Sequence, residues 1–172
     1  IWHAAVAQGR PLSDYAALAD TMMVSVSKGL GAPIGSLLIG TPETLALARV
    51  IRKRLGGGMR QSGVLAAAAQ VAVTQNVERL ADDHRRAREL ATACAEARPG
   101  SCELATVETN IVLLQLTSSD DTASAPAFVA RAADAGLRIS AIGPHTVRLV
   151  THLDVTDDDT AAAVQILRSL LS

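Results

Sequence analysis

Aromatic residues are almost absent from this chain. Among 172 residues there is one Trp, one Tyr and one Phe, 2% in total, although hydrophobic residues of all kinds make up 49%. Aromatic and β-branched side chains are the ones that suit β-sheets, whereas alanine suits helices, so this alanine-rich composition favours closely packed helices over a β-sandwich. The length is sufficient for a domain with a hydrophobic core of its own.

Charge excess, cysteine and long apolar runs are also scarce. The formal net charge is −1, and no basic run is long enough to bind nucleic acid electrostatically, so we expect no nucleic-acid partner. No apolar run approaches the length of a membrane span and no signal-peptide pattern occurs, so we expect no membrane association. The two cysteines, Cys94 and Cys102, belong to no metal-spaced cluster, which predicts a reduced cytoplasmic protein without a metal site.

Glycines, prolines and capping residues divide the chain into an α/β succession of elements. In chain order we expect short helices within 1–20 with Ser13 as an N-cap, strands at 21–27 and 35–40, helices at 42–55, 61–76 and 77–97, a strand at 110–116, a helix at 125–135, strands at 137–141 and 147–151, and a last helix capped by Thr156. The break at 98–101 predicts a boundary between a first domain, 1–98, and a compact α+β domain, 99–172.

One lysine stands at the start of a glycine-rich bend, directly after the first expected strand. The segment 26–31 reads VSKGLG, which makes the lysine Lys28. A lysine held at a strand end can form a Schiff base with an aldehyde cofactor, and glycines let a planar ring approach the backbone. The alternative is a surface lysine in an ordinary loop. Nucleotide loops do not fit, because a P-loop lysine follows its last glycine and because Gly29, Gly31 and Gly35 miss the dinucleotide spacing by one residue.

Four segments give the chain a family resemblance. They are SKGLGAPIGS at 27–36, RK at 52–53 followed by GGGMRQ at 56–61, TNI at 109–111, and VRLVTHLD at 147–154. In this order they resemble low-specificity L-threonine aldolases, which belong to the aromatic amino acid β-eliminating lyase/threonine aldolase group of fold-type I pyridoxal-phosphate enzymes. The resemblance covers essentially the whole chain. It implies an α/β fold in which 1–98 is the latter part of the cofactor-binding large domain and 99–172 is the small C-terminal α+β domain.

The resemblance implies pyridoxal 5'-phosphate as the cofactor and assigns residues to it. Lys28 would form the internal aldimine with the cofactor aldehyde. Arg60 would serve the cofactor phosphate, because it follows three glycines in a loop that lies at the dimer interface of the family. Lys53 is a weaker candidate for the same electropositive wall.

Arg148 is the candidate for binding the substrate carboxylate. Its neighbours on the expected strand are apolar, so its side chain points away from the core. A guanidinium fork suits the two oxygens of an amino-acid carboxylate, while the alternative is an ion pair with Asp154 or with an acid on a helix; the resemblance implies the first of these. His152, whose type more often packs than acts as a base, and His3 are left outside the catalytic set.

The activity that the resemblance implies is a lyase reaction. L-Threonine, allo-threonine or a related β-hydroxy-α-amino acid would be cleaved to glycine and an aldehyde, in threonine catabolism and glycine biosynthesis. The family's Asp-Gly-Ala-Arg motif would precede the position of Ile1, and it is not in these 172 residues. We therefore expect an incomplete chain of a cytoplasmic homo-oligomer, a dimer or tetramer, that is inactive in isolation. Two rival interpretations are a non-catalytic truncated remnant and another fold-type I lyase or transaminase.

Replacement of the lysine is the first test of these expectations. Lys28→Ala in the full-length protein should abolish the internal aldimine, because no other amine of the bend can replace the Lys28 amine. The measurement is the visible absorbance band of the protein with pyridoxal phosphate, with the unaltered protein as the control. A band that persists in the variant would contradict the assignment of Lys28.

Overall fold

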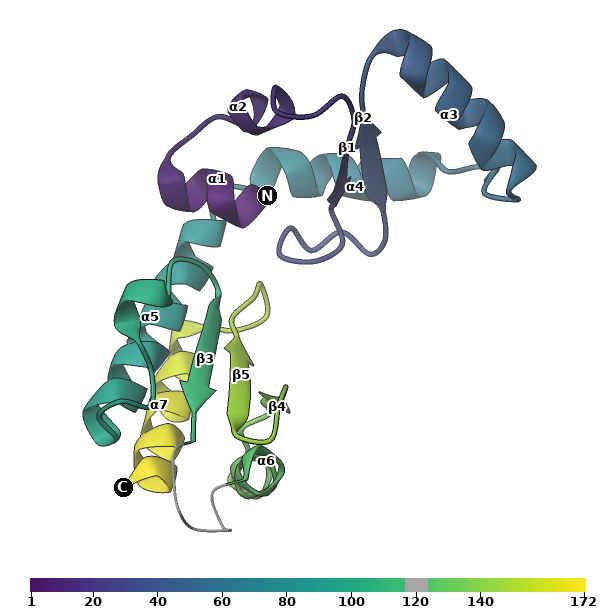
Figure 1. Cartoon of the computed structure of the whole chain (residues 1–172). Coiled ribbons are helices and arrows are strands. Elements are labelled where there is room, and N and C mark those ends of the chain that lie inside the picture. The colour runs from purple at the N-terminus through teal and green to yellow at the C-terminus, as the bar shows by residue number, and fades with distance from the viewer. Residues whose placement is uncertain (117–123) are drawn as a thin grey trace. The chain divides into compact units, whose positions relative to one another are not determined.

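A computed structural model describes residues 1–116 and 124–172 of the chain. Its elements are α1 (Trp2–Gln8), α2 (Leu12–Ala16), β1 (Met22–Ser25), β2 (Ser36–Ile39), α3 (Pro42–Arg54), α4 (Gly63–Gln75), α5 (Leu80–Ala97), the short 3-10 helix η1 (Leu104–Thr106), β3 (Ile111–Gln115), α6 (Ala125–Asp134), β4 (Ser140–Ala141), β5 (Thr146–Val150) and α7 (Asp157–Leu171) (Figure 1). The expected α/β succession is confirmed. Within the described ranges, no helix is both long and apolar enough to cross a membrane.

The chain forms two compact units, Ile1–Leu80 and Ala81–Ser172. They divide at the start of α5, whereas the sequence places a domain boundary after residue 98. The difference concerns α5 alone, and it arises because the buried residues of α5, such as Ala91 and Cys94, belong to the core of the second unit. The boundary between 1–98 and 99–172 stays a prediction about domains.

The first unit combines a two-stranded antiparallel sheet with helices. β1 and β2 pair from Met22 opposite Ile39 to Ser25 opposite Ser36. Its core is small and consists of Val26, Leu30, Ala32, Ala72 and Leu80, with Trp2, Val6, Ala69, Val73 and Val77 packed against it. Two of these core residues, Val26 and Leu30, flank Lys28 in sequence, so burial on both sides fixes the lysine-bearing bend.

Helix starts in the first unit show where local signals suffice. α3 begins as expected, with the Thr41 hydroxyl accepting a hydrogen bond from the Thr44 amide at 3.3 Å. The expected cap at Ser13 is wrong, because α2 begins at Leu12 and its N-cap is Pro11. Proline sets its own φ near the value found there, −66°, and the helix starts directly after it.

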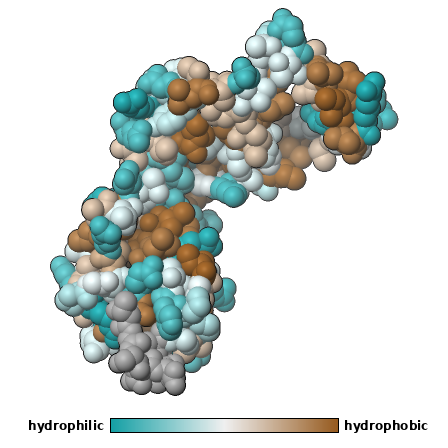
Figure 2. Space-filling model, viewed as in Figure 1, coloured by the Kyte–Doolittle hydropathy of each residue, from teal (hydrophilic) through white to brown (hydrophobic). Residues whose placement is uncertain are grey.

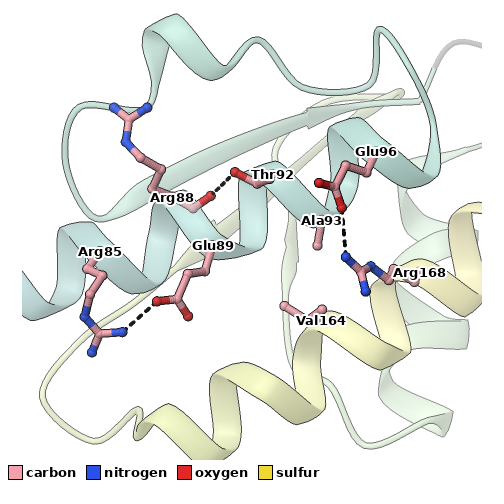
Figure 3. Close-up of a pocket in the computed structure, with 8 residues that line it drawn as sticks. All are labelled: Arg85, Arg88, Glu89, Thr92, Ala93, Glu96, Val164 and Arg168. Atoms are coloured by element: carbon pink, nitrogen blue, oxygen red, sulfur yellow. Dashed lines mark hydrogen bonds and ion pairs between the residues drawn. The ribbon is translucent and has the colours of Figure 1, made fainter.

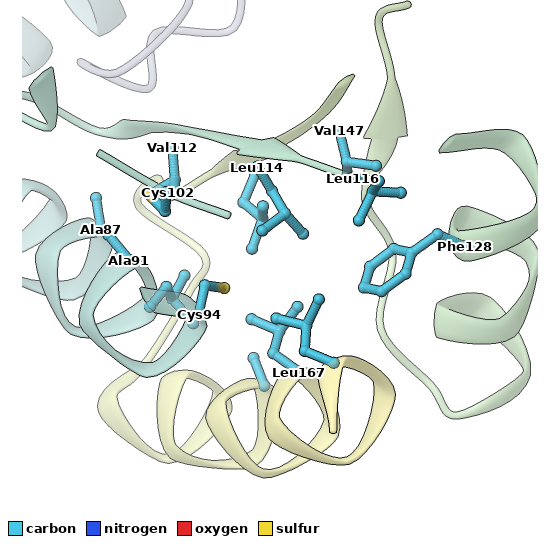
Figure 4. Packing of buried hydrophobic residues seen from close by; sticks show 14 of the residues in the cluster. Ala87, Ala91, Cys94, Cys102, Val112, Leu114, Leu116, Phe128, Val147 and Leu167 are labelled. Atoms are coloured by element: carbon cyan, nitrogen blue, oxygen red, sulfur yellow. The ribbon is translucent and has the colours of Figure 1, made fainter. Parts of the chain in front are cut away.

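The second unit is a three-stranded antiparallel sheet in the order β3–β5–β4. α5 and α7 lie side by side along one face of it (Figure 1). Alternate strand residues therefore point into the core, among them Val112, Leu114 and Val147, and they meet side chains from three helices (Figure 4). Phe128 of α6 and Leu167 of α7 are almost completely buried in this cluster.

Helix α7 is tied to α5 through its first residue. The carboxylate of Asp157 accepts hydrogen bonds from Arg85 and Arg86, each at 2.7 Å, and the first of these contributes most to lowering the pKa of Asp157. Within α5, Arg85 also pairs with Glu89 at 2.7 Å.

The expected strand at 137–141 is shorter in the structure, where only Ser140 and Ala141 pair with β5. Residues 136 and 137 end helix α6 instead. Gly136 has a φ of +91°, and the Leu137 amide donates to the Ala132 carbonyl oxygen at 2.8 Å. A helix end that uses these backbone groups leaves fewer residues for the strand.

The N-cap of α7 gives a test of stability. Thr156→Ala should lower the free energy of unfolding by about 1 kcal/mol, because the Thr156 hydroxyl and the Asp159 carboxylate form a reciprocal capping box. Urea unfolding followed by circular dichroism measures this effect. The matched control is Ser169→Ala on the exposed side of the same helix, and equal losses in both variants would contradict a specific role of the cap.

Candidate functional site

Lys28 lies at the corner of a tight turn between β1 and β2. The Gly31 amide donates to the Lys28 carbonyl oxygen at 2.8 Å, and the Ala32 amide donates to the Val26 carbonyl oxygen at 2.9 Å. Gly31 has a φ of +73°, a value that side chains with a Cβ rarely adopt. Val26 and Leu30, on the two sides of Lys28, are buried, whereas the Lys28 side chain is exposed.

The bend is fastened by side chains distant in sequence. The Asn76 side-chain amide donates to the Leu30 carbonyl oxygen at 2.7 Å, and the Arg79 guanidinium donates to the Gly29 carbonyl oxygen at 3.3 Å. The Trp2 indole N–H donates to the Ser25 carbonyl oxygen at 2.8 Å. Sequence reasoning missed all three donors, because no local spacing connects them to the bend.

A cavity of about 340 Å³ opens beside this turn, within the first unit. Residues of α1 and β1 line it together with Lys28, Gly29, Leu30 and Leu80. Its volume falls in the range of small-molecule sites, and its walls are mainly apolar, with the Lys28 amine and the His3 imidazole among the polar groups. Apolar walls with a lysine amine suit a planar aldehyde, because the amine can react with the aldehyde.

Another cavity, of about 450 Å³, lies between α5 and α7 in the second unit (Figure 3). Most of its charged side chains pair across or along the helices. Arg85 contacts Glu89 at 2.7 Å, and Arg168 contacts Glu96 at 2.8 Å. The Arg168–Glu96 pair joins α7 to α5 and the Arg85–Glu89 pair lies within α5, so these charges already have partners and we assign this cavity a structural role.

The cysteines do not provide a nucleophile. Cys94 and Cys102 are free and buried in the core of the second unit. Burial raises the pKa of Cys94 to about 12 and also raises the pKa of Cys102, so both stay protonated thiols near neutral pH.

Arg60 and Lys53 are exposed and lie away from the Lys28 cavity. Lys53 belongs to the last turn of α3, and Arg60 follows the three glycines in the connection to α4. In the sequence, five cations and no carboxylate occur between Glu43 and Glu78. This cationic segment can bind an anion, but its residues Lys53 and Arg60 do not line the Lys28 cavity.

Arg148 lies in the second unit, on β5. Its neighbours on the strand are buried and its own side chain is exposed, as expected. Among the described residues the alternative ion pair between Arg148 and Asp154 does not form, and the Asp154 carboxylate lies 3.6 Å from the His152 imidazole. Across the sheet, Arg148 lies opposite Leu113 on one side and Ser140 on the other.

Solved structures share this fold. Threonine aldolase from Leishmania major matches 99% of the chain with a TM-score of 0.78 at 19% identity, over 49% of its own length. Serine palmitoyltransferase from Sphingomonas wittichii matches 92% of the chain with a TM-score of 0.69 at 16% identity, over 41% of its length. The fold class is thus the latter part of the fold-type I α/β fold, as expected.

Sequence comparison gives the family. The model of the Beta-eliminating lyase family matches residues 1–117, so the chain belongs to this family. The low specificity L-threonine aldolase of Escherichia coli O157:H7 is 37% identical over 172 residues, which are 100% of this chain and 49% of that protein. Low-specificity L-threonine aldolase 1 of Arabidopsis thaliana is 34% identical over 159 residues, 92% of this chain and 44% of that protein. The chain thus spans about half the length of the curated relatives it matches.

The glycine of the lysine turn provides a test of the site's backbone. Gly31→Ala should lower the free energy of unfolding by about 1–2 kcal/mol, because alanine is strained at a positive φ. Gly63→Ala is the matched control, since this glycine begins α4 and an added methyl group would meet no atom within 4 Å. Chemical denaturation of both variants measures the difference. A control that loses as much stability as Gly31→Ala would contradict the strain argument.

Proposed function

We propose that the complete protein is a pyridoxal-phosphate-dependent aldolase. It would cleave L-threonine, allo-threonine or a related β-hydroxy-α-amino acid to glycine and an aldehyde. The observation that carries the proposal is the exposed Lys28 amine on a rigid glycine turn that lines a cavity. Membership of the family and the named activities of the relatives support the reaction class.

The residues around Lys28 fit the cofactor. When bound, pyridoxal phosphate supplies an electron sink for the bond that breaks at the substrate α-carbon. Lys28 would hold it covalently through its amine, and Leu30 and Leu80 would exclude water from one wall of the cavity. Arg60 lies away from this cavity, on the glycine loop that the family resemblance places at the dimer interface, so it would bind a cofactor phosphate across that interface.

Arg148 would orient the substrate in this proposal. Its guanidinium is exposed on β5, and within the described part of the chain it forms no ion pair. A planar fork with free donors can bind both oxygens of the substrate carboxylate, which fixes the direction of the bond to be cleaved. The exposed apolar side chain of Leu113, opposite Arg148 in the sheet, would reduce the competition from water.

A homo-oligomer in the cytoplasm is the proposed state of the complete protein. Apolar side chains cover much of β2 and α3, where Leu37, Leu38, Ile39, Leu47 and Leu55 are between 40% and 81% exposed. Brown apolar residues gather over the α3 region in Figure 2. Surfaces of this kind are expected to be covered in an assembly. The free state of both cysteines supports a reducing compartment.

Product analysis tests the reaction class. The complete protein, incubated with pyridoxal phosphate and L-threonine, should release glycine and acetaldehyde in equal amounts. Chromatography for glycine and an enzymatic assay for acetaldehyde measure the two products. Amino-group transfer to an added oxoacid, or no turnover, would instead favour a transaminase or a non-catalytic remnant.

A second kinetic test concerns Arg148. Arg148→Ala should raise KM for threonine by about tenfold or more, because the carboxylate loses a charge-assisted pair. The control is Arg138→Ala, which removes an exposed guanidinium from the same unit but not from β5. Equal KM values in both variants would refute the proposed role of Arg148.

A further inference from the structure

The imidazole of His3 packs directly against the backbone of Gly29. A Cβ atom at position 29 would lie 2.5 Å from Nε2 of His3 and 3.1 Å from its Cε1. The first distance is far shorter than any ordinary contact of a side chain, so the ring occupies the space that a residue other than glycine would need. His3 and Lys28 also line the same cavity.

We propose that His3 is a positioning residue for Lys28. Its ring lies against Gly29, the residue next to Lys28, and so fixes the direction in which the lysine amine leaves the turn. The proposal rests on the function proposed above, since it gives His3 a role in the reaction of that amine. It also explains why position 29 is glycine, because its backbone φ does not require one while the contact with His3 does.

Contacts on the other sides of the bend support this role. From α1, the indole N–H of Trp2 donates to the Ser25 carbonyl oxygen at 2.8 Å, so two consecutive residues of one helix contact the bend. From the connection between α4 and α5, Arg79 holds the Gly29 carbonyl oxygen at 3.3 Å. His3 therefore contacts Gly29 from the α1 side, while Arg79 binds the carbonyl oxygen of the same residue.

Rigid support of this kind matters because capture of an aldehyde depends on geometry. A displacement of a reacting group by about 1 Å can cost roughly 100-fold in rate. The Lys28 side chain is exposed, and the fixed part is the backbone from which it starts. Loss of the His3 ring would leave a gap beside Gly29 and allow this backbone to move.

The experiment compares His3 variants of the complete protein. Pyridoxal phosphate is trapped on Lys28 with borohydride, and peptide mass spectrometry follows the rate of labelling. His3→Ala should slow labelling by about tenfold, whereas His3→Gln, whose amide reaches the position of Nε2, should stay within about threefold of the unaltered protein. His145→Ala is the matched control, since it removes an exposed histidine from the second unit.

Hydrogen exchange provides a readout that needs no cofactor. The Gly31 amide, bonded to the Lys28 carbonyl oxygen at 2.8 Å, should exchange several-fold faster in His3→Ala than in His145→Ala. Circular dichroism of each variant checks that the remaining fold is intact. Unchanged exchange and unchanged labelling in His3→Ala would overturn the proposal.

A double-mutant cycle tests the direct contact. Gly29→Ala should impair labelling strongly beside His3 and less in the His3→Ala background, where the contact at 2.5 Å is removed and the end of Leu80 lies 3.1 Å from the added methyl group. Additive effects would show that the ring does not bear on position 29 and would overturn the proposal. If the unaltered protein is never labelled at Lys28, the proposed function fails, and the exchange data still decide whether His3 holds the turn.

Discussion

The hydrogen bond between the Gly31 amide and the Lys28 carbonyl oxygen defines the turn on which the candidate site depends. The bond of 2.8 Å closes a turn of four residues, and Gly31, the last of them, has a φ of +73°. Only glycine adopts that value without strain. Buried side chains on both sides of the turn, Val26 and Leu30, then leave the lysine as the one long side chain that must point outward.

Around that turn the first unit has little core of its own, and polar contacts to the backbone supplement it. The five buried residues of its core cluster are few for a unit that also exposes the apolar side chains of β2 and α3. Trp2, Asn76 and Arg79 each donate to a carbonyl oxygen in or next to the bend. Hydrogen bonds of partly buried carbonyl groups are costly to lose, so these donors restrict the bend more than their number suggests.

The second unit, by contrast, depends mainly on its larger hydrophobic core. Its sheet buries one face under α5 and α7, and the pattern of alternate burial on β3 and β5 follows directly from the alternation of residues in the sequence. That same alternation leaves Arg148 on the open face. The ion pairs between α5 and α7 lie on the outer side of the helices, where they fix how the two helices meet and add little stability in water.

Local signals were sufficient where neighbouring residues decide the outcome. The start of α3 at residue 42, the Thr156 cap of α7 and the strand alternation at Arg148 were all visible in the sequence, because each depends on residues within a few positions. The short strand β4 was harder to predict, since the end of α6 and the strand compete for the same backbone groups. A pattern of residue types does not show which element takes them.

By itself, the sequence determined the α/β succession, the family and the lysine on its glycine bend, because these depend on residue types at fixed spacing. Only the tertiary structure decided what surrounds that lysine. The grip of Trp2 and His3 on the bend, and the bonds from Asn76 and Arg79, join residues about 23 to 50 positions apart. Folding brings them together to satisfy carbonyl groups and to fill the space beside a glycine, and no local pattern records which partners will meet.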